Sequence, residues 1–165
     1  MLLKRPETEI NAEDYYNSSF YFYNASIRCS KVEINSNGIA KSLFISAMSN
    51  AAFACELVIK AIYFTINGKG TKGHDLYKLI NKLPNNEKNT IYEKLIAISY
   101  IDAENMLKEY GDSFTVWRYI FEYETSFQFY KNFLSDLYGI LVIVYNMATE
   151  AKIDFTNSYL PPDSP

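Results

Sequence analysis

The chain has 165 residues, of which 48% are hydrophobic and 21% charged, a composition that excludes wholesale disorder and favours one globular domain. Its formal charge of −3 argues against a protein that coats duplex DNA, because such binding depends on clustered Lys and Arg. With 2 cysteines and 1 histidine, neither a disulfide scaffold nor the usual zinc site is expected. We therefore predict no metal and no cofactor.

The first predicted helix covers residues 12–34. Asn11 is a suitable cap, and Tyr16, Phe20, Tyr23 and Ile27 follow at helical spacing. The aromatic side chains of this helix suit either a packed interface or base stacking, and packing is the commoner role. Residues 35–38 are predicted to form a turn.

The second predicted helix, residues 40–66, has the clearest pattern of the chain. Its apolar residues form two adjacent rows, so it should be central and buried on a wide face. Asn67 and Gly68 provide its stop. The rows are Leu43, Ala47, Ala51, Ala54, Val58 and Ala61, and Phe44, Met48, Cys55, Ile59 and Ile62.

The rest of the chain alternates short helices with loops. A glycine-rich loop over 68–73 lacks the Walker pattern of phosphate-binding loops. Helices are predicted from Leu76 to Pro84, from about 86 to 98, and over 103–110 after Asp102. Residues 112–124 show no helical pattern. A capping box at 125–128 begins the last helix, predicted over 126–149, and residues 151–165 are predicted to be a loose tail.

These elements predict an all-α, up-and-down bundle of four to six helices, with a single domain over 1–150. The two long apolar helices expose more surface than a small bundle buries, so we expect a homodimer. No segment has the pattern of a signal peptide or a membrane span. A cytoplasmic protein that does not enter membranes is therefore expected.

Three polar residues near the second helix are candidates for ligand binding. Glu56 and Lys60 lie one turn apart, and they form either a ligand or partner contact, a solvated ion pair, or a buried pair. His74 is either a base or phosphate ligand beside Lys72, or a helix-start residue whose ring bonds a nearby backbone group.

Charge is distributed unevenly along the chain. Residues 60–94 contain seven basic and three acidic residues, whereas residues 102–124 contain two basic and six acidic ones. Lys69, Lys72, Lys78 and Lys82 belong to the basic strip, which suits RNA phosphates or the acidic strip of a partner. Such runs are also commonly solvated faces.

The order of these motifs resembles the HEPN domain. The resemblance rests on Ala54-Cys55-Glu56-Leu57-Val58-Ile59-Lys60-Ala61, on the basic loop before Gly73-His74-Asp75-Leu76, and on Trp117-Arg118-Tyr119, and it covers roughly 40–145. It implies an all-α, usually dimeric bundle. Many members are metal-independent ribonucleases of toxin–antitoxin and phage-defence systems, and others are binding modules.

The resemblance also implies a role for Arg118. Active HEPN proteins have an Arg and a later His with four to six residues between them, paired across the dimer. Here those positions are Tyr123, Glu124 and Thr125. The histidine is missing, which favours degenerate catalysis. In an active protein, Arg118 would stabilise the phosphorane and Glu122 or Glu124 would be a candidate base. An ion pair of Arg118 with Glu122 or Glu124 is the structural alternative.

The leading hypothesis is therefore a HEPN-like dimer that binds RNA or a nucleotide through Arg118 and the 69–82 region. The alternatives are an endoribonuclease that uses Arg118, and a non-enzymatic dimerisation or adaptor module. A toxin–antitoxin setting would bring a protein partner such as a nucleotidyltransferase.

Overall fold

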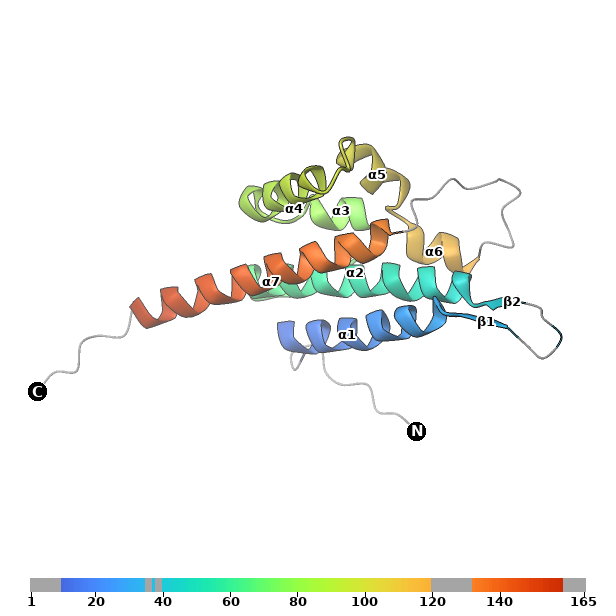
Figure 1. The fold of residues 1–165 in the computed structure, drawn as a ribbon. Coiled ribbons are helices and arrows are strands. Elements are labelled where there is room, and N and C mark those ends of the chain that lie inside the picture. Colours follow the sequence, from blue (N-terminus) through green and yellow to red (C-terminus); the bar gives the residue numbers. More distant parts are fainter. Residues whose placement is uncertain (1–9, 35–36, 38–39, 120–131, 159–165) are drawn as a thin grey trace, which may run out of the picture.

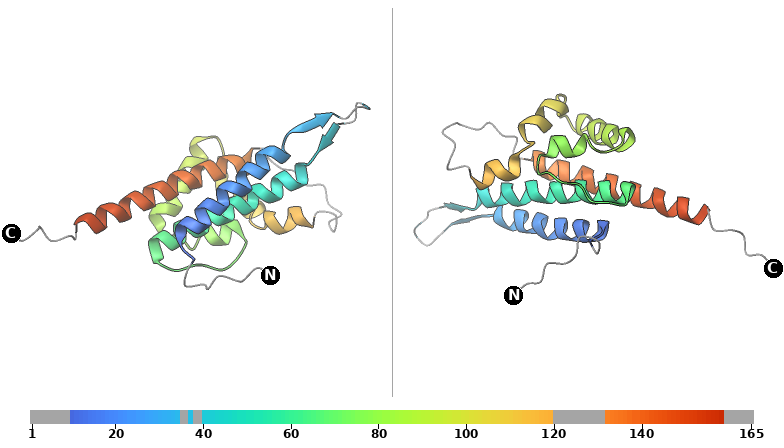
Figure 2. Two further views of the ribbon diagram at one scale, coloured as in Figure 1. Left: turned by 90° about the horizontal axis from the view of Figure 1, so that it is seen from below. Right: turned by 180° about the vertical axis from the view of Figure 1, so that it is seen from behind.

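A computed structural model describes residues 10–34, 37, 40–119 and 132–158 of the chain. Helices α2 and α7 form the middle of the molecule, with α1 on one side and α3, α4 and α5 on the other (Figure 1; Figure 2). The predicted all-α class is confirmed. The elements are α1 (Ala12–Cys29), β1 (Val32–Ile34), β2 (Ala40–Ser42), α2 (Phe44–Asn67), α3 (Leu76–Ile80), α4 (Asn85–Ala97), α5 (Ala103–Glu109), α6 (Ser113–Arg118) and α7 (Phe133–Ser158).

Helix α2 is the core of the bundle, as its sequence predicts. It is in contact with α1, α3, α6 and α7, and Ala52, Val58 and Ile59 are completely buried. Small side chains such as Ala54 allow the neighbouring helices to approach closely. Most of the two apolar rows are thus covered within one chain, although Leu43 at the start of the first row is 60% exposed and Ile45 is 49% exposed. The expected homodimer stays a prediction.

Helix α2 also has the length and hydropathy of a membrane span, with a mean hydropathy of 1.4 over its most apolar window. Within the bundle, 67% of that window is buried. Packing against the neighbouring helices therefore accounts for its apolar composition.

Helix α1 packs against α7 through stacked tyrosines. The Tyr16 ring lies 4.3 Å from that of Tyr145, and the Tyr23 ring lies 3.9 Å from that of Tyr138. The Tyr23 hydroxyl is also 2.7 Å from the hydroxyl of Ser135. The rings of Tyr16 and Tyr23 are therefore part of a packed interface, whereas Tyr21 on the same helix is 73% exposed.

The first helix is shorter than predicted. Its predicted cap is confirmed, because the Asn11 side chain accepts from the Asp14 amide and the Asp14 carboxylate accepts from the Asn11 amide. The helix ends at Cys29, and β1 then pairs antiparallel with β2, with Glu33 opposite Lys41. Val32 and Ile34 are β-branched at alternate positions, which favours a strand. The prediction of one helix through 34 missed this hairpin.

The second half of the chain follows the predicted order with three differences. Helix α3 ends at Ile80, before the predicted stop at Pro84. Helix α6 occupies part of the segment without a helical pattern. Helix α7 continues through Ser158 and does not end near 150. Within the described residues the bundle thus has seven helices, one more than the upper bound predicted. The capping box at 125–128 lies outside the described residues.

The turn between α4 and α5 is a helix-ending motif built on an unusual residue. The Ser99 amide donates to the Ile96 carbonyl, and the Tyr100 amide donates to the Leu95 carbonyl. Ser99 has φ 82°, in the left-handed region that such motifs normally fill with glycine. The backbone at Ser99 is therefore strained.

Replacing Ser99 with glycine should relieve this strain. We expect Ser99→Gly to raise the free energy of unfolding by about 0.5–1 kcal/mol, because a left-handed conformation disfavours any residue with a Cβ. Urea denaturation measures the change. A destabilised Ser99→Gly protein would show that the serine side chain stabilises the turn.

The two cysteines differ in their environment, and this predicts their reactivity. Cys55 is fully buried, and its thiol donates to the Leu134 carbonyl at 3.3 Å. Burial raises the pKa of the Cys55 thiol far above its usual range, so it remains protonated at pH 8. Cys29 is half-buried. A disulfide reagent at pH 8 should therefore modify Cys29 in the native protein and Cys55 only after unfolding, as peptide mapping would show.

Candidate functional site

The central feature of the site is a buried carboxylate on α2. The Glu56 side chain is 1% exposed and accepts a hydrogen bond from the Lys60 ammonium at 2.7 Å. Lys60 is itself only 12% exposed. Among the alternatives for this pair, the structure therefore shows the buried one. A buried charge requires such partners, because burial removes the water that would otherwise solvate it.

His74 is the second partner of this carboxylate. Its Nδ1 lies 3.1 Å from both carboxylate oxygens of Glu56. An ionised carboxylate only accepts hydrogen bonds, so Nδ1 carries the proton and Nε2 is left for a ligand. The side chain is 61% exposed, which makes this ring edge accessible. The prediction of a bond from the ring to a backbone group was wrong.

The segment around His74 is fixed by the residues before α6. Asp75 caps α3 by accepting from the Lys78 amide at 2.9 Å, and the Leu76 amide donates to the Gly111 carbonyl at 2.6 Å. A Cβ on Gly111 would lie 2.8 Å from an Asp75 carboxylate oxygen, so a larger residue at Gly111 would force the two segments apart. These contacts place His74 beside α6.

Helix α6 contributes an aromatic ring and a cation. Phe114 stacks on Phe53 of α2, with ring centroids 4.7 Å apart, and the His74 ring centroid lies 6.2 Å from that of Phe114. The Arg118 guanidinium lies 5.2 Å from the centroid of Phe114 and 5.3 Å from that of Tyr119. Glu56, Lys60, His74, Phe114 and Arg118 thus form one continuous cluster, which we call the α2–α6 site.

The predicted lysines have varied surroundings. Lys82 donates to the Lys72 carbonyl at 2.7 Å and to the Thr71 hydroxyl at 3.3 Å, so it closes the glycine-rich loop. Lys78 pairs with Asp75 at 3.0 Å and is 77% exposed. Lys69 and Lys72 are exposed on the loop that leads to His74. Glu122 and Glu124 lie outside the described residues, as does any ion pair of Arg118 with them.

The sequence interpretation missed the aromatic part of the site. Phe114 and Arg118 are four residues apart on α6, the spacing of side chains that meet on a helix, but α6 itself was not predicted. Phe53 lies one turn before Glu56 on α2. Among the described residues, no group of three or more His, Cys, Asp or Glu side chains is arranged to hold a metal ion.

The fold and site define an all-α bundle with a histidine and an arginine beside one aromatic ring. A family model of the HEPN domain matches residues 30–140, and the chain belongs to this family. The family predicted from the sequence is thereby confirmed. No curated protein and no solved structure gave a significant match.

Proposed function

We propose that this HEPN protein binds single-stranded RNA or a nucleotide at the α2–α6 site. The observation that supports this most is the stack of Phe53, Phe114 and Arg118 beside the exposed ring of His74. Arginine planes and aromatic rings accept an unpaired base by stacking, and the guanidinium and imidazole also contact phosphate. An RNA base extends this stack, and its phosphate lies against Arg118 and His74.

The glycine-rich loop supplies further positive charge. Lys69 and Lys72 are exposed on it, immediately before His74, whereas the chain as a whole has a net charge of −3. Binding is therefore local to this site and weakens as salt screens a small number of phosphate contacts.

A fluorescence-polarisation titration with a labelled single-stranded RNA of mixed sequence tests this function. We expect salt-sensitive binding that weakens about tenfold in Arg118→Ala, because a charge-assisted phosphate contact and a stacking surface are lost together. Lys94→Ala is the matched control, since Lys94 lies on α4 and is not part of the site. Equal loss in both variants, or no binding by the native protein, would contradict the proposal.

The contact between Glu56 and His74 favours a second candidate function, metal-independent RNA cleavage. In this mechanism, Nε2 of His74 takes the proton of the 2′-hydroxyl, and the 2′-oxygen attacks phosphorus. The 5′-oxygen leaves with a proton from water, which yields a 2′,3′-cyclic phosphate. Arg118 stabilises the charge of the phosphorane. Glu56 holds the His74 ring in the required tautomer.

Cleavage of RNA in excess EDTA tests this second function. His74→Gln should abolish cleavage and retain most of the RNA affinity. If wild-type and His74→Gln proteins cleave equally, the activity belongs to a contaminant. If neither cleaves, the protein is a binding module, which fits the incomplete Arg-to-His motif.

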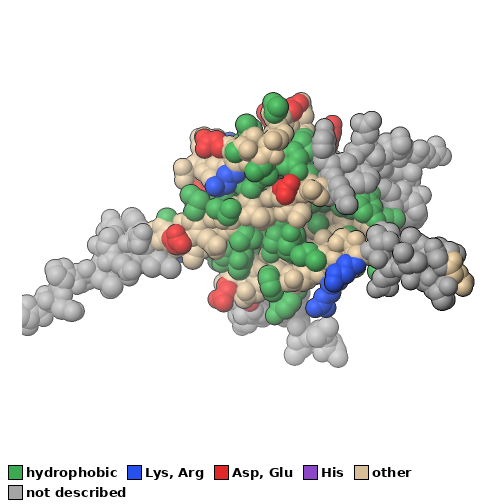
Figure 3. Space-filling model, viewed as in Figure 1, with side chains coloured by type: hydrophobic (Ala, Val, Ile, Leu, Met, Phe, Trp, Pro, Cys, Tyr) green, Lys and Arg blue, Asp and Glu red, His purple; other side chains and the backbone are tan. Residues whose placement is uncertain are grey.

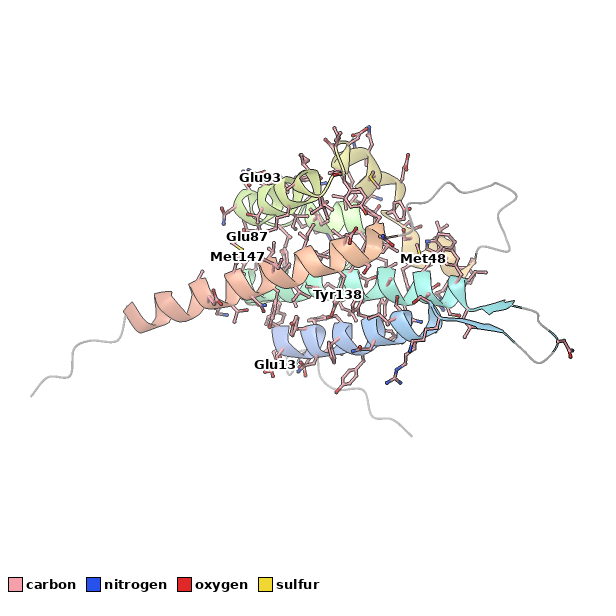
Figure 4. All side chains as sticks on the ribbon, in the orientation of Figure 1. Glu13, Met48, Glu87, Glu93, Tyr138 and Met147 are labelled. Atoms are coloured by element: carbon pink, nitrogen blue, oxygen red, sulfur yellow. The ribbon has the colours of Figure 1, made fainter. Side chains whose placement is uncertain are left out.

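We also propose that the protein is a homodimer through the face formed by α1 and α7. Exposed apolar side chains on these helices include Phe20, Ile27, Ile143 and Met147. Figure 3 shows hydrophobic side chains gathered over both helices, and Figure 4 places Tyr138 and Met147 on α7 in the same view. Sedimentation equilibrium should give a dimer that Ile143→Lys dissociates. A monomeric native protein would refute the proposed homodimer.

The biological setting that we propose is a toxin–antitoxin or phage-defence system. A nucleotidyltransferase encoded beside this chain would support it. A purely adaptor role is the third candidate function. It predicts a stoichiometric protein partner and no binding of RNA.

A further inference from the structure

The turn from α4 to α5 displays three isoleucines to solvent. Ile96, Ile98 and Ile101 are 52%, 47% and 86% exposed. Among the described residues, Ile101 has a larger exposed fraction than any other large apolar side chain. Beside them lies a groove of about 510 Å³ whose lining includes Tyr92, Ile96, Ile101 and Asp102. A single exposed apolar residue is ordinary, but a cluster beside a groove indicates an interaction surface. We call this surface the α4–α5 corner.

The α4–α5 corner is held by contacts to the rest of the bundle. The Tyr100 hydroxyl donates to the Asp136 carboxylate on α7 at 2.7 Å, and its ring meets the Phe133 ring edge-on at 5.2 Å. The hydrogen bonds of Ser99 and Tyr100 to α4 fix the backbone between Ile98 and Ile101. A partner therefore meets preordered isoleucines and does not have to order a loop.

The charges around the corner are mainly acidic where they are exposed. Glu93, Asp102, Glu104 and Glu109 are exposed, whereas Lys88 and Lys94 on the same elements are half-buried. Lys108 is exposed but pairs with Glu104 at 2.8 Å. Figure 3 shows acidic side chains beside hydrophobic ones over α4 and α5, and Figure 4 labels Glu93 there. Lys88 also lines the groove, but the exposed edge of the corner is mainly acidic, which favours a basic partner over RNA.

We propose that the α4–α5 corner docks a basic amphipathic helix of a partner protein. An apolar side chain of that helix enters the groove between Tyr92 and Ile101, and its Lys or Arg side chains lie against the exposed carboxylates of Asp102 and Glu93. Such a helix combines the two properties that the corner complements, an apolar stripe and a positive edge. A second copy of this chain is disfavoured, because a two-fold axis would bring the same acidic residues together.

Site-specific photocrosslinking in the native cell tests this proposal. A photoreactive phenylalanine derivative replaces Ile101 in the full chain, and the same replacement of Ile143 on α7 is the control. The expected crosslink from Ile101 maps to a segment of a different protein with apolar residues three or four apart and flanking Lys or Arg. Crosslinks to RNA, to a second copy or to an acidic segment would overturn the proposal, as would the same product from Ile143.

A synthetic peptide of the mapped segment then measures the contribution of the corner. Ile101→Ser should weaken its binding about tenfold or more, as truncation of a central interface residue does, and Asp102→Lys should weaken it further at low salt. RNA binding and the thermal midpoint should stay unchanged in Ile101→Ser, because this side chain is 86% exposed and outside the α2–α6 site. Unchanged peptide binding in both variants would refute the proposal.

Discussion

Replacing Glu56 with alanine should lower the free energy of unfolding by about 3–5 kcal/mol, because it leaves a largely buried ammonium without its carboxylate. Lys60 is 12% exposed and lies 2.7 Å from Glu56. The change also removes the carboxylate that His74 contacts from the start of α3. Guanidinium denaturation followed by circular dichroism measures the loss.

Two further variants separate the charge from the packing. In Glu56→Met with Lys60→Met, neither charge remains, and we expect the double variant to be more stable than Glu56→Ala. Glu104→Ala is the matched control for an exposed pair at the same spacing, since Glu104 and Lys108 are 57% and 47% exposed. It should leave the denaturation midpoint unchanged. A loss in Glu104→Ala as large as that in Glu56→Ala would contradict the role of burial.

Replacing Phe114 with leucine should weaken RNA binding about tenfold, because stacking on an aromatic side chain contributes about 1–3 kcal/mol per base. Phe114 lies between Phe53 and Arg118, so its loss also removes the surface that orients the guanidinium. Leucine keeps an apolar side chain of similar size, and stability should fall by less than about 1.5 kcal/mol. Polarisation titrations and denaturation, performed on the same preparation, measure the two effects separately.

Phe20→Leu provides the control for this substitution. Phe20 is 57% exposed on α1 and is not part of the α2–α6 site, so the same chemical change there should not alter RNA affinity. If Phe114→Leu binds RNA as the native protein does, the aromatic stack is structural and the base is held elsewhere.

Local signals in the sequence account for most of what was predicted correctly. The Asn11 cap, the two apolar rows of α2 and the start of α5 after Asp102 each depend on residues within a few positions of one another. Helix α6 was missed because six residues are too few to show a period, and its position depends on packing against α2. The β1–β2 hairpin was missed because three-residue strands give an equally short pattern.

The sequence predicted the individual residues of the site but not how they are arranged in space. Glu56, Lys60, His74 and Arg118 were all singled out, yet nothing in the sequence indicated that His74 meets a carboxylate 18 residues away. That contact depends on the turn through Gly73 and on the bond between Leu76 and Gly111. The contacts of Lys82 could not be predicted for a related reason, since its hydrogen bonds to its own loop become visible only when the loop is folded.

The position of bound RNA is the most direct test of the α2–α6 site. An RNA that carries 4-thiouridine is crosslinked to the native protein by ultraviolet light, and the tryptic peptides are mapped. We expect crosslinks in residues 109–118, which contain Phe114, and in residues 73–78, which contain His74. Crosslinks confined to α4 and α5, or to the outer face of α1, would contradict it.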